Sequence, residues 1–138
     1  MFVGAAGKLL DELLKGSRIR RSDIYITNIV KYRPPNNRDP LISEKEAFLP
    51  YLLRQIAIIN PKIIVTLGRH SLSSLMPELK LSLVHGIPQK LRLASNELKL
   101  KLQDIILVPF YHPAAAIYNP KMKPILMDDF KILNQFIT

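Results

Sequence analysis

The sequence has no cysteine among its 138 residues. This absence excludes disulfide bonds, thiolate-held metal sites and a cysteine nucleophile. The sequence also lacks an apolar run long enough to span a bilayer. Its first residues do not show the basic segment followed by an apolar segment that marks a signal peptide. We therefore expect a cytoplasmic protein without membrane contact and without a bound metal.

Acidic side chains are scarce relative to basic ones. The chain carries 20 Lys and Arg against 11 Asp and Glu, a formal net charge of +9. Such an excess on a small domain favours a polyanionic partner, most often nucleic acid, although a merely basic domain is the alternative. The length and the 48% hydrophobic content suit one core, so we expect residues 1–138 to form a single, monomeric domain.

Apolar periodicity predicts helices and strands in alternation. In chain order we expect a helix at 8–15, a strand at 24–30, a helix opened by a capping box of Ser43 and Glu46, a strand at 63–67, a short helix at 71–76, a hairpin at 89–103, a strand at 105–110 and a helix at 123–137. Pro50 either kinks the helix in which it lies or marks that helix's first turn. The alternation predicts an α/β fold, a three-layer sandwich with a mostly parallel sheet.

Two polar residues follow predicted strands at their carboxyl ends, Asn28 and His112. In a parallel sheet these ends share one edge, where ligands bind, so the two side chains should converge. An amide and an imidazole in a basic domain could read a planar polar group. A strand-end asparagine and histidine bonded to the backbone are the alternative.

Each of these strands leads into an unusual loop. Residues 31–40 contain three prolines and the cations Lys31, Arg33 and Arg38, which predicts a stiff polar loop. After His112 come a proline and three alanines, and then an apolar pair, Ile117 and Tyr118, that we expect to be exposed.

Four segments together resemble a known family. Residues 2–10 are similar to its "PFVGxAGxLL" segment and residues 25–38 to its "YITNxVKCRPPNNR" segment; VTLG at 65–68 and HPAAA at 112–116 resemble two further motifs. The family is that of the iron–sulfur (family four) uracil-DNA glycosylases, and the resemblance covers essentially the whole chain. It implies hydrolysis of the N-glycosidic bond of uracil in DNA, with the base flipped out of the helix.

The resemblance also implies roles for residues of the base pocket. Phe2 matches the aromatic residue that stacks on uracil. Asn28 matches the amide that reads uracil O4 and N3–H, a pair that cytosine does not offer. His112 matches the histidine that donates to uracil O2 and stabilises the negative charge of the leaving base.

Further roles concern the DNA backbone and groove. Ile117 and Tyr118 match the loop that enters the minor groove and fills the space left by the base. Lys31, Arg33 and Arg38 would contact phosphates or brace their loop. Lys121 and Lys123 are candidate phosphate contacts by charge alone, whereas His70 and His85 are expected to be structural.

Two departures from the family pattern bear on activity. The family's [4Fe–4S] cluster is held by four cysteines, and two of those positions are Tyr32 and Phe48 here. We therefore expect no cluster, with a hydrophobic plug in its place. The family's first motif is absent, and with it the central strand between the segments at 24–30 and 63–67. A DNA-binding relative without catalytic activity, or a truncated product, is thus the alternative to an active glycosylase.

Overall fold

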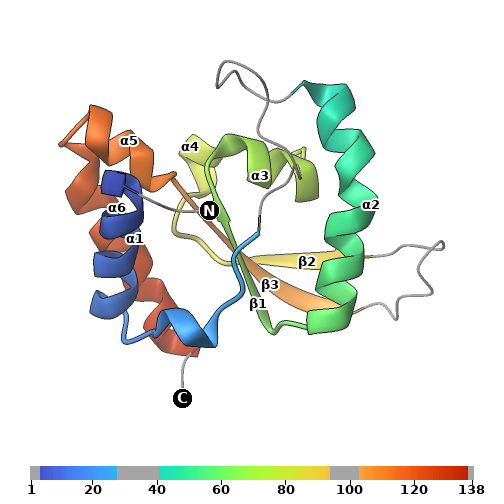
Figure 1. Cartoon of the computed structure of the whole chain (residues 1–138), viewed down its shortest axis with the longest axis horizontal. Helices are drawn as coiled ribbons and strands as arrows, with labels where there is room; N and C mark the ends of the chain where they lie inside the picture. The colour runs from blue at the N-terminus through green and yellow to red at the C-terminus, as the bar shows by residue number, and fades with distance from the viewer. Residues whose placement is uncertain (1–3, 28–40, 94–102, 137–138) are drawn as a thin grey trace.

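A computed structural model describes residues 4–27, 41–93 and 103–136 (Figure 1). Within them the elements are α1 (Gly4–Gly16), the 3-10 turn η1 (Arg21–Asp23), α2 (Ile42–Ile59), β1 (Ile63–Leu67), α3 (Arg69–Leu75), α4 (Leu81–Val84), β2 (Gln89–Leu93), β3 (Gln103–Phe110), α5 (Pro113–Tyr118), α6 (Met122–Phe130) and the 3-10 helix η3 (Lys131–Phe136). In the part of the chain that is described, no helix has both the length and the apolar character needed to cross a membrane.

The described strands form one mixed sheet in the order β1-β3-β2. β1 runs parallel to β3, from Ile63 opposite Ile106 to Leu67 opposite Phe110. β2 runs antiparallel to β3. The predicted α/β class is confirmed, but a mostly parallel sheet is not, because one of the two described pairings is antiparallel.

The predicted hairpin differs from the observed one in its second arm. β2 pairs with β3 itself, Gln89 opposite Leu107 and Leu93 opposite Gln103. The hairpin at 89–103 and the strand at 105–110 are therefore not separate units. The alternation of Leu91 and Leu93 with polar residues correctly indicated extended backbone, but it carried no information about which segment was the partner.

Side chains of β3 alternate between two apolar clusters, as the pleat of a strand requires. Val108 and Phe110 pack with α1 and α6 on one face. Ile105 packs with α2 and Leu107 with α3 on the opposite face. Helices thus contact both faces of the sheet, and β3 lies between them (Figure 1).

Helix α2 begins earlier than its predicted capping box. Leu41 precedes the first turn, and its backbone N–H donates to the Glu44 carboxylate at 2.8 Å. Ser43 therefore lies inside the first turn, and the predicted box of Ser43 and Glu46 is wrong. Pro50 lies within the helix, which continues on both sides of it, so it does not mark the first turn.

The predicted strand at 24–30 is wrong for the residues that can be judged. Residues 24–27 are not part of the sheet, and 28–30 lie outside the described residues. Gln55 of α2 donates to the Tyr25 hydroxyl at 3.4 Å and accepts from the Thr27 hydroxyl at 3.1 Å. β-branched residues fit an extended backbone, but a strand also needs a paired neighbour, which propensity cannot supply.

β1 lies at one edge of the described sheet, although an apolar run such as that at Ile63–Leu67 is typical of a strand buried on both faces. Its central residue, Val65, keeps 38% of its surface exposed. Ile63 and Leu67, on the same face, are only partly buried against the core. An apolar run therefore identified the strand but overstated its burial.

The carboxyl-terminal helix is confirmed, with a change of geometry partway. Leu126, Phe130 and Leu133 lie at helical spacing and are buried, although α6 ends at Phe130 and a 3-10 helix follows. The buried Ser17 hydroxyl donates to the Phe130 carbonyl at 3.1 Å, which joins the end of α6 to the end of α1. Ile137 lies outside the described residues.

Phe130→Ala should be strongly destabilising, because the Phe130 ring stacks on Phe110 with centroids 4.2 Å apart in the centre of the core. We expect a loss of about 3–5 kcal/mol in the free energy of unfolding, measured by urea titration. Met127→Ala is the matched control on the same helix, since Met127 is 52% exposed; it should change stability by less than about 0.5 kcal/mol. Equal losses in the two variants would contradict this packing.

Candidate functional site

The carboxyl ends of β1 and β3 bring two loops together. Leu67 lies opposite Phe110, and the Gly68 N–H donates to the Phe110 carbonyl at 2.8 Å. Gly68 has φ of 87°, and a Cβ there would lie 3.4 Å from the His112 Cβ. A glycine at this position therefore lets the β1 loop approach His112 closely. This edge is where an α/β sheet places its ligands.

The His112 imidazole is oriented by the helix that follows it. His112 is the N-cap of α5, and its Nδ1 accepts a hydrogen bond from the Ala114 N–H at 3.0 Å. An acceptor Nδ1 carries no proton, so the proton of the neutral ring is on Nε2. Burial lowers the pKa of His112, because desolvation disfavours the imidazolium. His112 is thus a neutral hydrogen-bond donor through Nε2.

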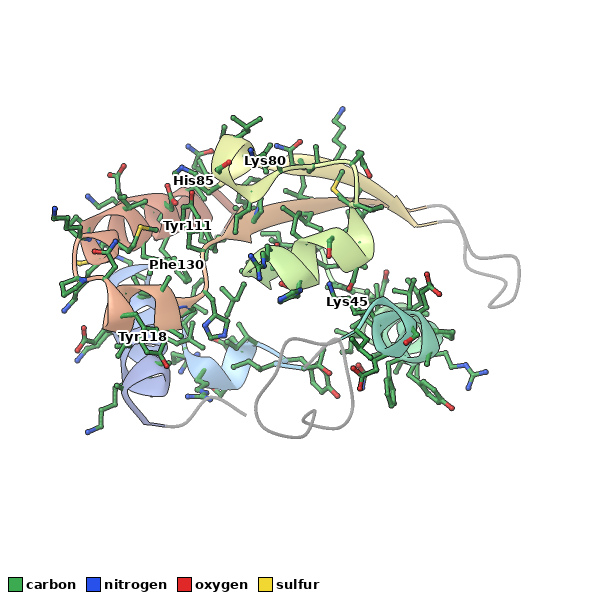
Figure 2. The ribbon with its side chains drawn as sticks, turned by 90° about the horizontal axis from the view of Figure 1, so that it is seen from above. Lys45, Lys80, His85, Tyr111, Tyr118 and Phe130 are labelled. Atoms are coloured by element: carbon green, nitrogen blue, oxygen red, sulfur yellow. The ribbon has the colours of Figure 1, made fainter. Side chains whose placement is uncertain are left out.

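Helix α5 connects this histidine to an exposed apolar tip. Pro113 and Ala116 are buried, whereas Ile117 is 46% and Tyr118 89% exposed. The predicted exposure of Ile117 and Tyr118 is confirmed, and Figure 2 shows Tyr118 at the outer surface. The six residues of α5 span about 9 Å at the usual helical rise. One short helix therefore has a half-buried donor at its start, in the N-cap His112, and an apolar tip at its end.

The two candidate phosphate contacts after α5 differ in their surroundings. Lys121 is exposed. The Lys123 ammonium lies 3.6 Å from the Glu12 carboxylate, with both side chains at least half exposed. Such a surface pair is weak and is screened by salt, so Lys123 can exchange Glu12 for another anion at little cost.

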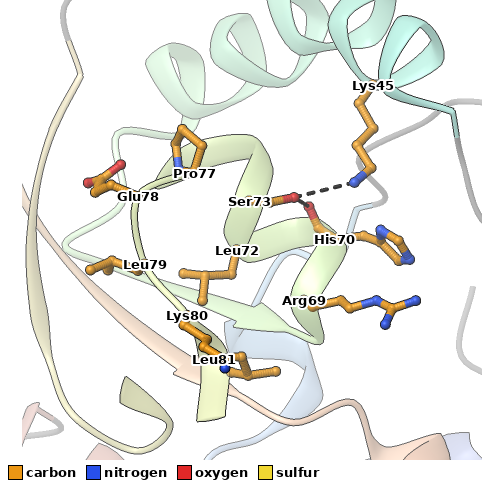
Figure 3. Close-up of a pocket in the computed structure, with 10 residues that line it drawn as sticks. All are labelled: Lys45, Arg69, His70, Leu72, Ser73, Pro77, Glu78, Leu79, Lys80 and Leu81. Atoms are coloured by element: carbon orange, nitrogen blue, oxygen red, sulfur yellow. Dashed lines mark hydrogen bonds between the residues drawn. The ribbon is translucent and has the colours of Figure 1, made fainter. Parts of the chain in front are cut away.

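A cavity of about 450 Å³ lies beside α3, next to the loop that contains Gly68 (Figure 3). Its walls include Lys45, Arg69, His70 and Lys80, and the Lys45 ammonium donates to the Ser73 hydroxyl at 3.3 Å. His112 does not line this cavity. Glu78 also lines the cavity, so the three Lys and Arg side chains of its wall outnumber one carboxylate. Arg69 begins the helix directly after Gly68.

The described residues contain only part of the predicted site. His112, Ile117 and Tyr118 have the positions given above. The remaining predicted site residues lie outside the described residues; they are Phe2, Asn28, Lys31, Arg33 and Arg38. The predicted convergence of Asn28 with His112 therefore stays a prediction.

His85 contacts both a distant carboxylate and the residue next to His112. Its Nδ1 lies 2.7 Å from the Asp129 carboxylate, and its ring lies 4.8 Å from the ring of Tyr111, the residue before His112. From the sequence alone, His85 had no role beyond the structural one that we expected of it. Asp129 gave no signal, because it is distant in sequence and looks like any solvated helix residue.

The residues present do not fit a thiolate-held iron–sulfur cluster. The sequence contains no cysteine, and the described residues include no group of three or more His, Cys, Asp or Glu side chains that could hold a metal. Phe48, at one of the family's ligand positions, packs its ring 6.0 Å from that of Tyr51. Tyr32 lies outside the described residues.

Comparison with known proteins agrees with the motifs. The model of the uracil DNA glycosylase superfamily matches residues 1–135. The chain belongs to this superfamily. A type-4 uracil-DNA glycosylase of Sulfurisphaera tokodaii is 50% identical over 135 residues, 97% of this chain and 60% of the relative.

Two further type-4 uracil-DNA glycosylases are similar over nearly all of the chain. The enzyme of Saccharolobus solfataricus is 44% identical over 138 residues, 99% of this chain and 63% of the relative. That of Archaeoglobus fulgidus is 39% identical over 136 residues, 97% of this chain and 66% of the relative. The resemblance to the type-4 glycosylases is confirmed, and the chain spans 60 to 66% of the length of these relatives.

The protonation of His112 can be measured by an NMR titration of its imidazole, identified with a His112→Gln variant. We expect a midpoint below the ordinary value of about 6.5, because burial lowers the pKa of His112. In urea the same imidazole should return to about 6.5. Since the unfolded chain then binds this proton first, His112 should reduce stability progressively as the pH falls below that value. If the His112 imidazole of the folded chain titrated with a midpoint above 6.5, the conclusion that His112 is a neutral donor would be wrong.

Proposed function

We propose that this chain hydrolyses the N-glycosidic bond of uracil in DNA, acting on a base flipped out of the helix. The observation that carries the proposal is the His112 imidazole, which is fixed by the Ala114 N–H as a neutral Nε2–H donor at the carboxyl end of β3. Membership of the superfamily and the names of the similar relatives support the same chemistry.

The chemistry needs a donor at the departing base. When the bond between C1′ and N1 breaks, its electron pair leaves with uracil, and negative charge spreads to the ring oxygens. A water oxygen bonds to C1′, and the proton that it releases balances the charge of the uracil anion. The His112 Nε2–H would donate to uracil O2, where that charge develops. A neutral donor gives this stabilisation without itself surrendering a proton.

Recognition of uracil is proposed to rest on two residues outside the described part of the chain. The Asn28 amide would accept from uracil N3–H and donate to O4, and the Phe2 ring would stack on the base. Cytosine presents the opposite donor and acceptor at these atoms, so one amide could discriminate between the two bases.

The DNA contacts are proposed to involve both loops at this edge of the sheet. Ile117 and Tyr118, at the exposed end of α5, would fill the space left by the flipped base. Lys31, Arg33 and Arg38 would contact phosphates, in keeping with the net charge of +9. Lys121 and Lys123 are supporting candidates.

We also infer that the chain works without an iron–sulfur cluster, and that the whole domain is a three-layer sandwich. The first inference is supported by the absence of cysteine, with Tyr32 and Phe48 at two ligand positions. The second is supported by helices that contact both faces of the described sheet.

Uracil release from a single-stranded oligonucleotide with one uracil tests the activity. His112→Ala should lower the single-turnover rate by about 10²- to 10³-fold, the usual effect of removing one donor to a developing anion. Asn28→Asp should weaken uracil recognition, since a carboxylate cannot donate to O4. Ile58→Ala, at a site on α2 that is 83% exposed, is the control and should keep full activity.

The outcome against the proposal is a folded chain that binds this oligonucleotide and releases no uracil. The chain would then be a DNA-binding relative without glycosylase activity. Binding measured by fluorescence anisotropy on the same samples separates this case from loss of the DNA site.

Metal analysis of the purified chain tests the absence of a cluster. We expect far less than one iron per chain, no visible absorption band, and a melting temperature unchanged by a chelator. The double variant Tyr32→Cys, Phe48→Cys should also remain free of iron, because a cluster of this kind needs four cysteine ligands. Stoichiometric iron in the unmodified chain would be the contrary result.

A further inference from the structure

We propose that His85 and Asp129 are positioning residues for the glycosylase reaction, and that they act on His112 through Tyr111. This inference rests on the proposed function and concerns its geometry. It starts from a pair that joins two distant parts of the chain: His85 follows α4, Asp129 lies in α6, and the His85 Nδ1 is 2.7 Å from the Asp129 carboxylate.

This pair is largely removed from solvent. The Asp129 side chain is 13% exposed and that of His85 30%. A carboxylate in such a place requires a hydrogen-bond donor, because an unpartnered buried charge is costly. The pair therefore fixes the His85 ring at one rotation, and a fixed ring can position what packs against it.

The residue that packs against the His85 ring is Tyr111, which precedes His112, the proposed catalytic histidine. The Tyr111 ring lies 4.8 Å from the His85 ring at an interplanar angle of 41°. Figure 2 shows His85 and Tyr111 together at the end of the molecule that also contains α6. Because Tyr111 is bonded directly to His112, a shift of its ring would be passed to the His112 backbone.

The backbone before Tyr111 is held by two further contacts. The Gly86 N–H donates to the Pro109 carbonyl at 2.7 Å, and the Gly68 N–H donates to the Phe110 carbonyl at 2.8 Å. The three residues that precede His112 are thus each held by a different contact. Two of these contacts come from His85 and Gly86.

The geometry of Gly86 links this turn closely to Asp129. Gly86 has φ of 73°, and a Cβ at this position would lie 2.5 Å from Asp129 Oδ1. Any larger residue would displace the carboxylate or the turn. His85, Gly86 and Asp129 therefore form one rigid contact beside the end of β3. Catalytic groups need placement to within about 0.5 Å, which such contacts can provide.

The test compares Asp129→Ala and the milder Asp129→Asn with Asp128→Ala. Asp128 is the matched control, because it is the adjacent acidic residue on α6, is 82% exposed and pairs only loosely with Lys131 at 3.9 Å. Each variant is assayed well below its melting temperature for single-turnover uracil release and for affinity to the uracil oligonucleotide. The ¹⁵N signals of the His112 imidazole are recorded on the same samples.

We expect Asp129→Ala to lower the release rate by roughly 10- to 100-fold, with DNA affinity within about twofold, as a small misplacement of a catalytic group does. Asp129→Asn should fall between it and the unmodified chain, and Asp128→Ala should match the unmodified chain. The His112 signals should change in the Asp129 variants from those of a single Nε2–H tautomer to those of a mixture.

Two substitutions of His85 separate its contacts. His85→Asn retains a donor near the Nδ1 position but loses the ring against Tyr111, whereas His85→Phe retains a ring and loses the donor. Both should lower the rate if the paired ring is the positioning element. Full activity in either variant would overturn that part of the proposal.

A purely structural role predicts a different pattern. The Asp129 variants would then melt at lower temperature yet keep the release rate and the His112 signals of the unmodified chain, and the proposal would fail. If the unmodified chain releases no uracil, the proposed function fails instead. The His112 signals would still decide whether Asp129 positions the imidazole.

Discussion

The parallel pairing of β1 with β3 is the constraint on which the rest of the site depends. It aligns Leu67 with Phe110, so that the next residues along each strand, Gly68 and the Tyr111-His112 pair, meet at one edge. The Gly68 N–H extends the pairing by one bond to the Phe110 carbonyl. A shift of one residue in this register would turn every side chain of β3 to the wrong face and move His112 away from Gly68.

Local patterns in the sequence were sufficient for most helices and for β1 and β3, because each has an apolar face of clear period. Leu9, Leu10, Leu13 and Leu14 in α1 are all buried, as the spacing predicts. Pairing was harder. Residues 24–27 have strand propensity without a place in the described sheet, and the partner of β2 was misjudged, since partner choice depends on contacts between distant segments.

The same limit applies to the site. His112 was predictable from its place after a buried strand and from its motif. Its tautomer was not, because that depends on the Ala114 N–H, a contact which exists only once α5 has formed. Gly68 was part of the VTLG motif, but its close approach to His112 was not predictable, because it depends on the pairing of β1 with β3. Asp129 was not recognisable as a neighbour of the site, since a helix carboxylate has no distinctive pattern of its own.

Two histidines lie near the end of β3, and their surroundings suit them to different tasks. His85 presents Nδ1 to a carboxylate, which favours a proton on that nitrogen and leaves the ring fixed in place. His112 presents Nδ1 to a backbone N–H, which requires a lone pair there and leaves the proton on Nε2. A donor to a departing anion has to be the second kind, because its proton must face the ligand. Tyr111 packs its ring against that of His85 and is bonded to His112 in the chain, so the fixed His85 ring can support the backbone that carries His112.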